Sequence, residues 1–155
     1  DAIAWTPDSS YVWIPTNVDS MTKHGANITF QSALSPEWNL NLGYSWLQQD
    51  TTSTSAIEII NPQPNGYRLG LNYAKKNWDV GLNMTLVAGR DLKYYSASNY
   101  CVFDFAANYT IDKNLRLYFK MNNITDRAYE IAGSTSPGLY PMPSRSYQLG
   151  AKYTF

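Results

Sequence analysis

The sequence predicts an all-β protein, an antiparallel up-and-down segment of a transmembrane β-barrel with about eight strands. Three observations lead to this prediction. Apolar and polar residues alternate in segments of about ten residues, which is the length of a strand that crosses a bilayer at a tilt. The links between these segments are alternately short and long. The chain closes on a strand-like stretch that ends in an aromatic residue, Phe155.

The alternating segments give the strands in chain order. In each of them every second side chain is apolar or aromatic, which places these side chains on one face of a strand. No long window shows the helical period. Asp1–Trp5 is interpreted as the end of an eighth strand whose beginning is missing. The segments and members of their apolar faces are His24–Leu34 (Ala26, Ile28, Phe30), Trp38–Trp46 (Leu40, Leu42, Tyr44), Tyr67–Tyr73 (Leu69, Leu71), Trp78–Leu86 (Val80, Leu82, Met84), Cys101–Tyr109 (Phe103, Phe105), Leu115–Asn122 (Leu117, Phe119, Met121) and Tyr147–Phe155 (Leu149, Ala151, Tyr153).

Six charged residues of these segments all fall on the polar faces. A Lys or Arg on a lipid-facing side would cost about 2–4 kcal/mol near the bilayer centre, so this sorting favours lipid on the apolar side. A half-buried soluble sheet would also turn its charges outward. In a barrel the opposite side faces the lumen, and the predicted lumen-facing charges are Arg68, Asp79, Asp104, Arg116, Lys120 and Lys152.

The links between the segments indicate two different ends of a barrel. The short links lie around Ser35–Glu37, Ala74–Asn77 and Thr110–Asn114, and the long ones are about Pro7–Met21, Gln48–Gly66, Ala88–Asn99 and Asn123–Arg145. Short periplasmic turns and long extracellular loops are typical of bacterial outer-membrane barrels. With Phe155 in the periplasm, aromatic residues collect at both rims, as membrane interfaces favour. They are Trp38, Tyr73, Trp78 and Tyr109 on the periplasmic side and Tyr44, Trp46, Tyr67 and Tyr147 on the outer side.

The composition is typical of a protein whose surface meets a membrane. Charged residues make up 15% of the chain, against roughly 25% in soluble domains. Aromatic residues also make up 15%, with 13 Tyr and 5 Trp. The mean hydropathy of −0.39 and the lack of an apolar run of about 18 residues exclude a transmembrane helix. Asp1–Trp5 shows no signal peptide, so we expect that one was removed or that the chain is a C-terminal piece.

The sequence lacks the residues that several classes of function require. Cys101 and His24 are the only cysteine and histidine, so a disulfide, a metal site and thiol catalysis lack their usual groups. No Ser-His-Asp set, carboxylate pair or glycine-rich phosphate loop is found. We therefore expect a protein that is not an enzyme and has no metal and no cofactor. The net charge of zero gives no electrostatic reason for binding nucleic acid.

The C-terminus resembles the assembly signal of bacterial outer-membrane β-barrels. In that signal a polar residue, a glycine and two final aromatic or apolar residues occur at fixed spacings. Gln148, Gly150, Tyr153 and Phe155 occupy these positions here. The resemblance implies that the barrel assembly machinery recognises this strand.

The stretch Asn114–Phe155 resembles the end of TonB-dependent outer-membrane receptors. The similar residues are Asn123-Ile124-Thr125-Asp126-Arg127-Ala128-Tyr129, then Pro143-Ser144-Arg145, then the final strand. Ile124-Thr125 and Ser144 depart from the more usual Leu-Phe and Gly. The resemblance implies a barrel of about 22 strands, with a plug domain in its lumen and energy supplied through TonB.

On this resemblance, residues 1–155 form the C-terminal part of the barrel and contain no plug domain. The cargo would be a scarce nutrient such as a ferric siderophore, haem or cobalamin. The expected location is the bacterial outer membrane. The expected partners are outer-membrane lipid and lipopolysaccharide, the remaining N-terminal barrel and plug (in the same protein or a separate chain), TonB via the plug, and the barrel assembly machinery.

Aromatic residues in the predicted extracellular loops are candidates for cargo contacts, because tyrosines can stack on or hydrogen-bond a large ligand. These candidates are Tyr94, Tyr95, Tyr129 and Tyr140. The alternative is that loop tyrosines only pack neighbouring loops.

Two other functions remain open from the sequence. The first is a complete small eight-stranded outer-membrane barrel that serves as an anchor or adhesin, with an interior filled by side chains. The second is a soluble tyrosine-rich β-barrel or sandwich that binds a small ligand, which requires its apolar faces to turn inward.

Overall fold

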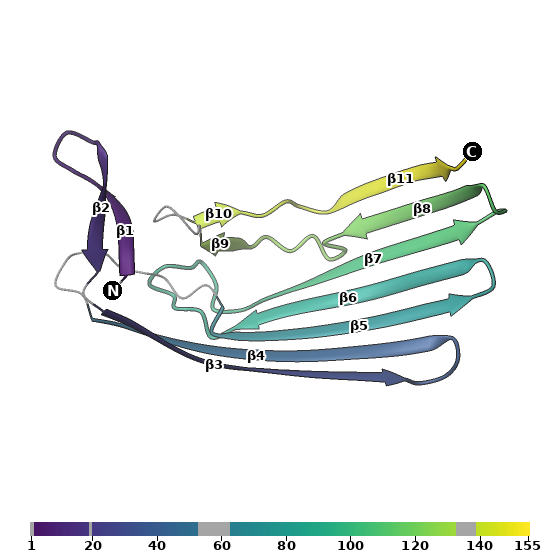
Figure 1. Ribbon diagram of the computed structural model, residues 1–155, viewed down its shortest axis with the longest axis horizontal. Coiled ribbons are helices and arrows are strands. Elements are labelled where there is room, and N and C mark those ends of the chain that lie inside the picture. Colours follow the sequence, from purple (N-terminus) through teal and green to yellow (C-terminus); the bar gives the residue numbers. More distant parts are fainter. Residues whose placement is uncertain (1, 19, 53–62, 133–138) are drawn as a thin grey trace.

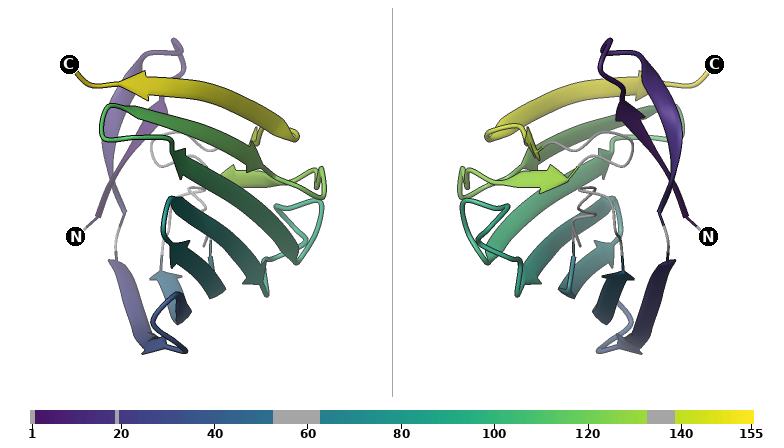
Figure 2. Two further views of the ribbon diagram at one scale, coloured as in Figure 1. Left: turned by 90° about the vertical axis from the view of Figure 1, so that its right-hand side faces the viewer. Right: turned by 90° about the vertical axis from the view of Figure 1, so that its left-hand side faces the viewer.

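A computed structural model describes residues 2–18, 20–52, 63–132 and 139–155. In this part the chain is all-β and its strands pair antiparallel. Seven long strands form one sheet in the order β11-β8-β7-β6-β5-β4-β3, so neighbours in the sheet follow one another along the chain (Figure 1). Figure 2 shows that this sheet is curved like a section of a barrel wall. No helix among the described residues is long and apolar enough to cross a membrane.

All seven predicted segments are strands of this sheet, which confirms the predicted fold class. They are β3 (Ser20–Ala33), β4 (Trp38–Thr52), β5 (Asn65–Lys75), β6 (Trp78–Ala88), β7 (Tyr100–Thr110), β8 (Leu115–Asn122) and β11 (Ser146–Tyr153). Short turns join them at one end of the sheet, here called the turn end. Longer links join them at the other end, here called the loop end.

The first two strands of the sheet extend further toward the loop end than the alternation predicted. β3 begins at Ser20 rather than at His24, and β4 runs to Thr52 rather than to Trp46. Their ladder continues through polar pairs such as Lys23 opposite Gln49. Backbone pairing does not require apolar side chains, so the strands continue beyond the region where a hydropathy pattern can reveal them.

The structure corrects the interpretation of the first residues as the end of a barrel strand. β1 (Ala2–Pro7) pairs with β2 (Trp13–Val18) in a separate two-stranded sheet and not with β3. The predicted loop Pro7–Met21 therefore contains a strand, which Pro15 and its short length hid from the pattern. The Asp8 carboxylate closes the hairpin by accepting hydrogen bonds from the backbone N–H groups of Ser10 and Val12, at 2.8 and 3.0 Å.

The register of the seven-stranded sheet joins the apolar sides of all its strands into one face. Directly opposed residues share a face, and Leu42 lies opposite Leu69, which lies opposite Met84. On the other face Asn41 lies opposite Gly70, which lies opposite Asn83. We call these the apolar face and the polar face. The apolar face is uncovered among the described residues, since its Ile28, Phe30, Leu42, Tyr147 and Leu149 are exposed.

Aromatic pairs mark both ends of the apolar face. Trp38 packs on Tyr73 and Trp78 on Tyr109 at the turn end, with ring centroids 4.9 and 4.7 Å apart. Nearer the loop end, the rings of Tyr44 and Tyr67 lie 5.0 Å apart. These cross-strand pairs join residues that the sequence placed at the two rims, and such pairs stabilise a sheet by about 0.2–1 kcal/mol each.

The buried side chains lie on the polar face at the loop end, not beneath the apolar face. The buried apolar residues of the described chain are Val87 at the end of β6, Val102 in β7, and Tyr95 in the link between these strands. A second small sheet of β9 (Glu130–Ala132) and β10 (Leu139–Pro141) belongs to the same end. Both strands fall inside the predicted loop Asn123–Arg145, where three-residue strands leave no periodic signal.

A charge at the middle of the apolar face provides a test of its contact with lipid. We expect Leu42→Arg to destabilise the protein in lipid vesicles by about 2–4 kcal/mol, because a guanidinium would enter hydrocarbon. Asn41→Arg, one position away on the polar face, is the matched control and should have little effect. Urea titration of the protein in vesicles measures both changes. Equal costs for the two variants would show that the apolar face does not meet lipid.

Candidate functional site

The six charged residues predicted to face the lumen share the polar face. The register shows this for every strand concerned. Only one ion pair joins them among the described residues, between Arg116 Nη2 and Asp79 Oδ2 at 3.3 Å. Its side chains are 47% and 58% exposed, so this pair contributes little stability. Lys23 in β3 lies on the same face and was missed because the predicted strand began one residue later.

At the loop end of this face, Asn123 joins three segments of the chain. Its side-chain N–H groups donate to the Arg127 and Pro143 carbonyl oxygens at 2.9 and 3.2 Å, and its side-chain oxygen accepts from the Arg127 N–H at 2.8 Å. Its backbone N–H donates to the Asp104 carboxylate at 2.8 Å. Asn123 is only 3% exposed and has a φ of 51°, a conformation that asparagine tolerates better than most residues.

Asp126 extends this junction to the start of β11. Its carboxylate accepts the backbone N–H of Arg145 at 2.8 Å and forms an ion pair with the same residue's guanidinium at 3.7 Å. Arg145 also donates to the Ile124 carbonyl oxygen at 3.4 Å. The Asn-Ile-Thr-Asp stretch and the later arginine, which carried the resemblance in the sequence, thus form one structural unit that leads the chain into its last strand.

Arg90 forms a second buried junction at the loop end. It is 3% exposed and donates to the carbonyl oxygens of Ala97 at 2.7 Å and Glu130 at 2.8 Å. Its guanidinium also lies over the rings of Tyr95 and Tyr100, 4.4 and 4.7 Å from their centroids. The bond to Glu130 joins the β6–β7 link to β9, and the other contacts hold the link against itself and the start of β7.

Glu130 completes the junction from the opposite side. Its carboxylate accepts hydrogen bonds from the Ser96 N–H at 2.6 Å and the Ser96 hydroxyl at 2.7 Å. These two bonds lower the pKa of Glu130 below its ordinary value. Three hydrogen bonds to Glu130, from Arg90 and Ser96, therefore join the β6–β7 link to β9.

The four candidate tyrosines occupy two kinds of position. Tyr95 is buried beneath Arg90, and Tyr129 is half-buried and stacks on Tyr100 with ring centroids 4.5 Å apart. Burial is the main cause that raises the pKa of both phenols. Tyr140 is 50% exposed and Tyr94 is partly exposed, with the Lys93 ammonium 5.2 Å from its ring centroid. Tyr140 is therefore the exposed ring of the four, Tyr94 and Tyr129 are partly exposed, and Tyr95 is buried.

The last strand contains the four residues of the predicted assembly signal. Gln148 and Gly150 lie on the polar face, opposite Lys120 and Tyr118 of β8. The Tyr118 ring lies over Gly150, and a Cβ at position 150 would collide with it. Glycine thus leaves room for the Tyr118 ring, which would have to move if position 150 carried a side chain. Tyr153 and Phe155 are exposed, with their rings edge to face at 5.1 Å.

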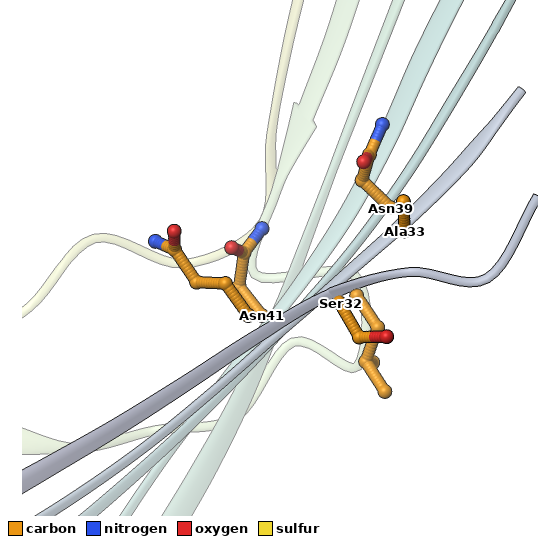
Figure 3. Close-up of a pocket in the computed structure, with 6 residues that line it drawn as sticks. Ser32, Ala33, Asn39 and Asn41 are labelled. Atoms are coloured by element: carbon orange, nitrogen blue, oxygen red, sulfur yellow. The ribbon is translucent and has the colours of Figure 1, made fainter. Parts of the chain in front are cut away.

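Two hollows lie on the described surface. One of about 290 Å³ lies between β3 and β4 at the turn end. Figure 3 shows that Asn39 and Asn41 point to one side of the sheet there and Ser32 to the other, so this hollow crosses the sheet edge and encloses nothing. A second, of about 240 Å³, lies beside the Asn123 junction and is lined by Asp104 and Tyr129 among others. No group of three or more metal-ligating side chains occurs in the described ranges.

Sequence reasoning missed the two residues that organise the loop end. Arg90 and Glu130 lie in predicted loops and are 40 positions apart. The one local signal was Gly89, which adopts a φ of 77° before Arg90 and so marks a special backbone position. No pattern in the neighbouring residues indicated that Arg90 is buried.

A family model described as "TonB dependent receptor-like, beta-barrel" matches residues 1–124. The vitamin B12 transporter BtuB of Photobacterium profundum is 25% identical over 163 residues, covering 99% of this chain and 25% of that protein. This chain thus spans about a quarter of the length of that relative.

Two solved structures share the fold at low sequence identity. The copper transporter OprC superposes with a TM-score of 0.75 and 19% identity, over 99% of this chain and 26% of that one. The FrpB iron transporter from Neisseria meningitidis (F3-3 variant) gives a TM-score of 0.73 and 18% identity, over 100% of this chain and 27% of that one. Both likenesses concern the fold alone.

The Asn123 junction provides a test of the loop end. We expect Asn123→Ala to destabilise the protein by about 1–3 kcal/mol, because buried groups lose their partners, and the positive φ adds to this cost. Asn122→Ala is the matched control, since Asn122 is exposed and its side chain makes one bond, to the Ser146 hydroxyl at 3.1 Å. Urea midpoints of the full-length protein in detergent measure both. Similar midpoints for the two variants would contradict the structural role of Asn123.

Proposed function

Because the chain belongs to the TonB-dependent receptor-like β-barrel family, we propose that it is the C-terminal part of an outer-membrane receptor that imports a scarce nutrient. The barrel would lie in the bacterial outer membrane, be closed by strands outside this sequence, and hold a plug through which TonB supplies energy. The protein would move its cargo without covalent chemistry. The homologues are transporters and receptors, which supports this proposal.

One observation carries the proposal: the described sheet is open, and its apolar and polar residues lie on opposite faces. A soluble barrel or sandwich would cover its apolar face, whereas this face exposes residues such as Ile28, Leu42 and Leu149. In a bilayer the same residues would contact lipid. The polar face, with its six sorted charges, would then line a lumen.

The direction of the edge strands supports a larger barrel over a complete small one. β3 and β11 are the edges of the sheet, and both run from the loop end to the turn end (Figure 1). If they met, they would pair parallel, but an up-and-down barrel pairs every neighbour antiparallel. In the proposed barrel an odd number of further strands would therefore lie between them. β1 does not fill this place, since it pairs with β2.

The cargo is proposed only as a class. The named relatives are transporters of vitamin B12, copper and iron, which agrees with import of a ferric siderophore, haem or cobalamin. We propose Tyr140 as a cargo contact because it is the exposed member of the four candidates, with the partly exposed Tyr94 as a second. Tyr95 and Tyr129 would support the loops from below.

Uptake of labelled cargo tests the function. We expect a strain that lacks the full-length protein to lose uptake of one cargo among radiolabelled cobalamin, haem and ferric siderophores. Uptake should also stop when TonB is removed, because the proposed mechanism takes its energy through TonB. Unchanged uptake of every cargo after deletion would contradict the proposal.

Binding of the same labelled cargo to intact cells tests Tyr140. Tyr140→Ala should weaken cargo binding to intact cells, because a ring that contacts cargo is lost. Tyr147→Ala removes an equally large and exposed ring from the apolar face and serves as the control. If both variants bind cargo as the parent does, Tyr140 is not a cargo contact.

Deletion of Phe155 tests the terminal strand as an assembly signal. We expect the deletion to reduce strongly the amount of full-length protein inserted into the outer membrane, because it removes the exposed terminal ring of the proposed assembly signal. Phe155→Tyr keeps an aromatic ring and should insert normally. Heat-modifiable mobility of the protein in outer-membrane fractions measures insertion. Normal insertion of the deletion variant would count against this role.

A further inference from the structure

Lys75 differs from the other cations in the strands of the seven-stranded sheet. It is the last residue of β5 and lies directly opposite Trp78, so it shares the apolar face with that ring. The other Lys and Arg residues in the strands of this sheet lie on the polar face, namely Lys23, Arg68, Arg116, Lys120 and Lys152. The apolar face of the described sheet thus has a cation only at its turn end.

Aromatic rings border Lys75 on the same face. Tyr73, two positions earlier in β5, packs on Trp38 with ring centroids 4.9 Å apart, and Trp78 packs on Tyr109 at 4.7 Å. Both tryptophans are exposed. Such rings settle at a membrane–water interface, and a lysine that is costly at the bilayer centre costs little near the interface. In the barrel proposed above, the Lys75 ammonium would therefore lie at the depth of the lipid headgroups.

Glu37 places a negative charge beside this cation. Its carboxylate forms an ion pair with the Lys75 ammonium at 3.2 Å and accepts a hydrogen bond from the Ser35 hydroxyl at 3.2 Å. The Glu37 carbonyl oxygen accepts the backbone N–H of Ala74 at 2.8 Å, which joins the β3–β4 turn to the end of β5. Figure 1 shows these two segments at the same end of the sheet. The backbone thus holds two opposite charges side by side.

Both members of this ion pair can bind a further group. The side chains of Lys75 and Glu37 are 53% and 32% exposed. An ammonium has three N–H donors and a carboxylate accepts several hydrogen bonds, so their contact with each other leaves capacity on both. The pair has no net charge and therefore offers an anion no excess of positive charge. A group with a negative and a positive charge close together complements it best.

We propose that Lys75 and Glu37, bordered by Trp38 and Trp78, bind the headgroup of a zwitterionic phospholipid that carries a primary ammonium, as phosphoethanolamine does. Lys75 donates to the phosphate oxygens, and Glu37 accepts from the ammonium. A primary ammonium has N–H groups to donate, whereas a choline has none and a glycerol headgroup has no positive charge. This inference rests on the proposed function, which places the turn end in a membrane. It adds a lipid class and the residues that select it.

Competition between three lipids tests the site. The full-length protein, extracted in detergent and freed of lipid, is mixed with equal amounts of phosphatidylethanolamine, phosphatidylglycerol and phosphatidylcholine that have identical acyl chains. Native mass spectrometry counts the lipids that the protein retains. We expect phosphatidylethanolamine to exceed each of the other two by about two- to fivefold, which is the size of effect that an exposed ion pair can produce.

Variants assign this excess to the two charges. Glu37→Gln should abolish it by removing the ammonium contact, and Lys75→Gln by removing the phosphate contact. Lys113→Gln, which removes an exposed cation from the β7–β8 turn, is the control and should keep the excess. An excess that survives both Glu37→Gln and Lys75→Gln would overturn the inference. Equal retention of the three lipids by the parent, or a preference for phosphatidylglycerol, would also overturn it.

Fractionation of the cell envelope keeps this test apart from the test of the proposed function. If the full-length protein is recovered in the outer membrane but retains the three lipids equally, the headgroup site alone is rejected, and the ion pair only fastens the β3–β4 turn to β5. A protein that is absent from the outer membrane overturns both proposals.

Discussion

The ladder of interstrand hydrogen bonds in the seven-stranded sheet is the constraint on which the other features depend. Because side chains alternate along a strand, a fixed register decides which residues share a face, and a slip of one position would exchange the two faces. The observed register brings Leu42, Leu69 and Met84 together on one side and Asn41, Gly70 and Asn83 on the other. A bilayer adds a second requirement, since backbone groups in hydrocarbon must find partners within the protein.

At the loop end the chain is held by side-chain contacts and not by the ladder of the sheet. There the chain leaves the sheet in long links, and buried polar residues hold them. Asn123 and Arg90 are each 3% exposed, and each donates to one nearby and one distant backbone carbonyl group. The buried apolar residues Val87 and Val102 lie on the same side of the sheet. The one small core of the described chain is thus on the polar face, where the links fold back, while the apolar face remains open.

The elements that could be predicted from the sequence are those in which apolar and polar residues alternate. Alternation identified all seven strands of the sheet and the face of six of their charges, because local geometry fixes both. The strands β2, β9 and β10 were missed, since Pro15 and a length of three residues remove the periodic signal. Arg90 and Glu130 were missed because their contact joins positions 40 apart. The family model covers residues 1–124, whereas the resemblance noted in the sequence was strongest in Asn114–Phe155, so the two assignments rest largely on different residues.

The edge of β3 bears on how the described sheet would continue. β3 is a 14-residue strand whose outer row of backbone groups has no neighbour in the described sheet, and its exposed Ile28 and Phe30 flank Thr29. Long uncovered edges of this kind are templates for pairing between molecules and for aggregation. Natural sheets block such edges with prolines, bulges or inward-pointing charges, but β3 has no proline and only one Lys or Arg, Lys23 near its start. In the barrel proposed above, a neighbouring strand would pair with β3 along its whole length, so β3 has no need of these blocking features.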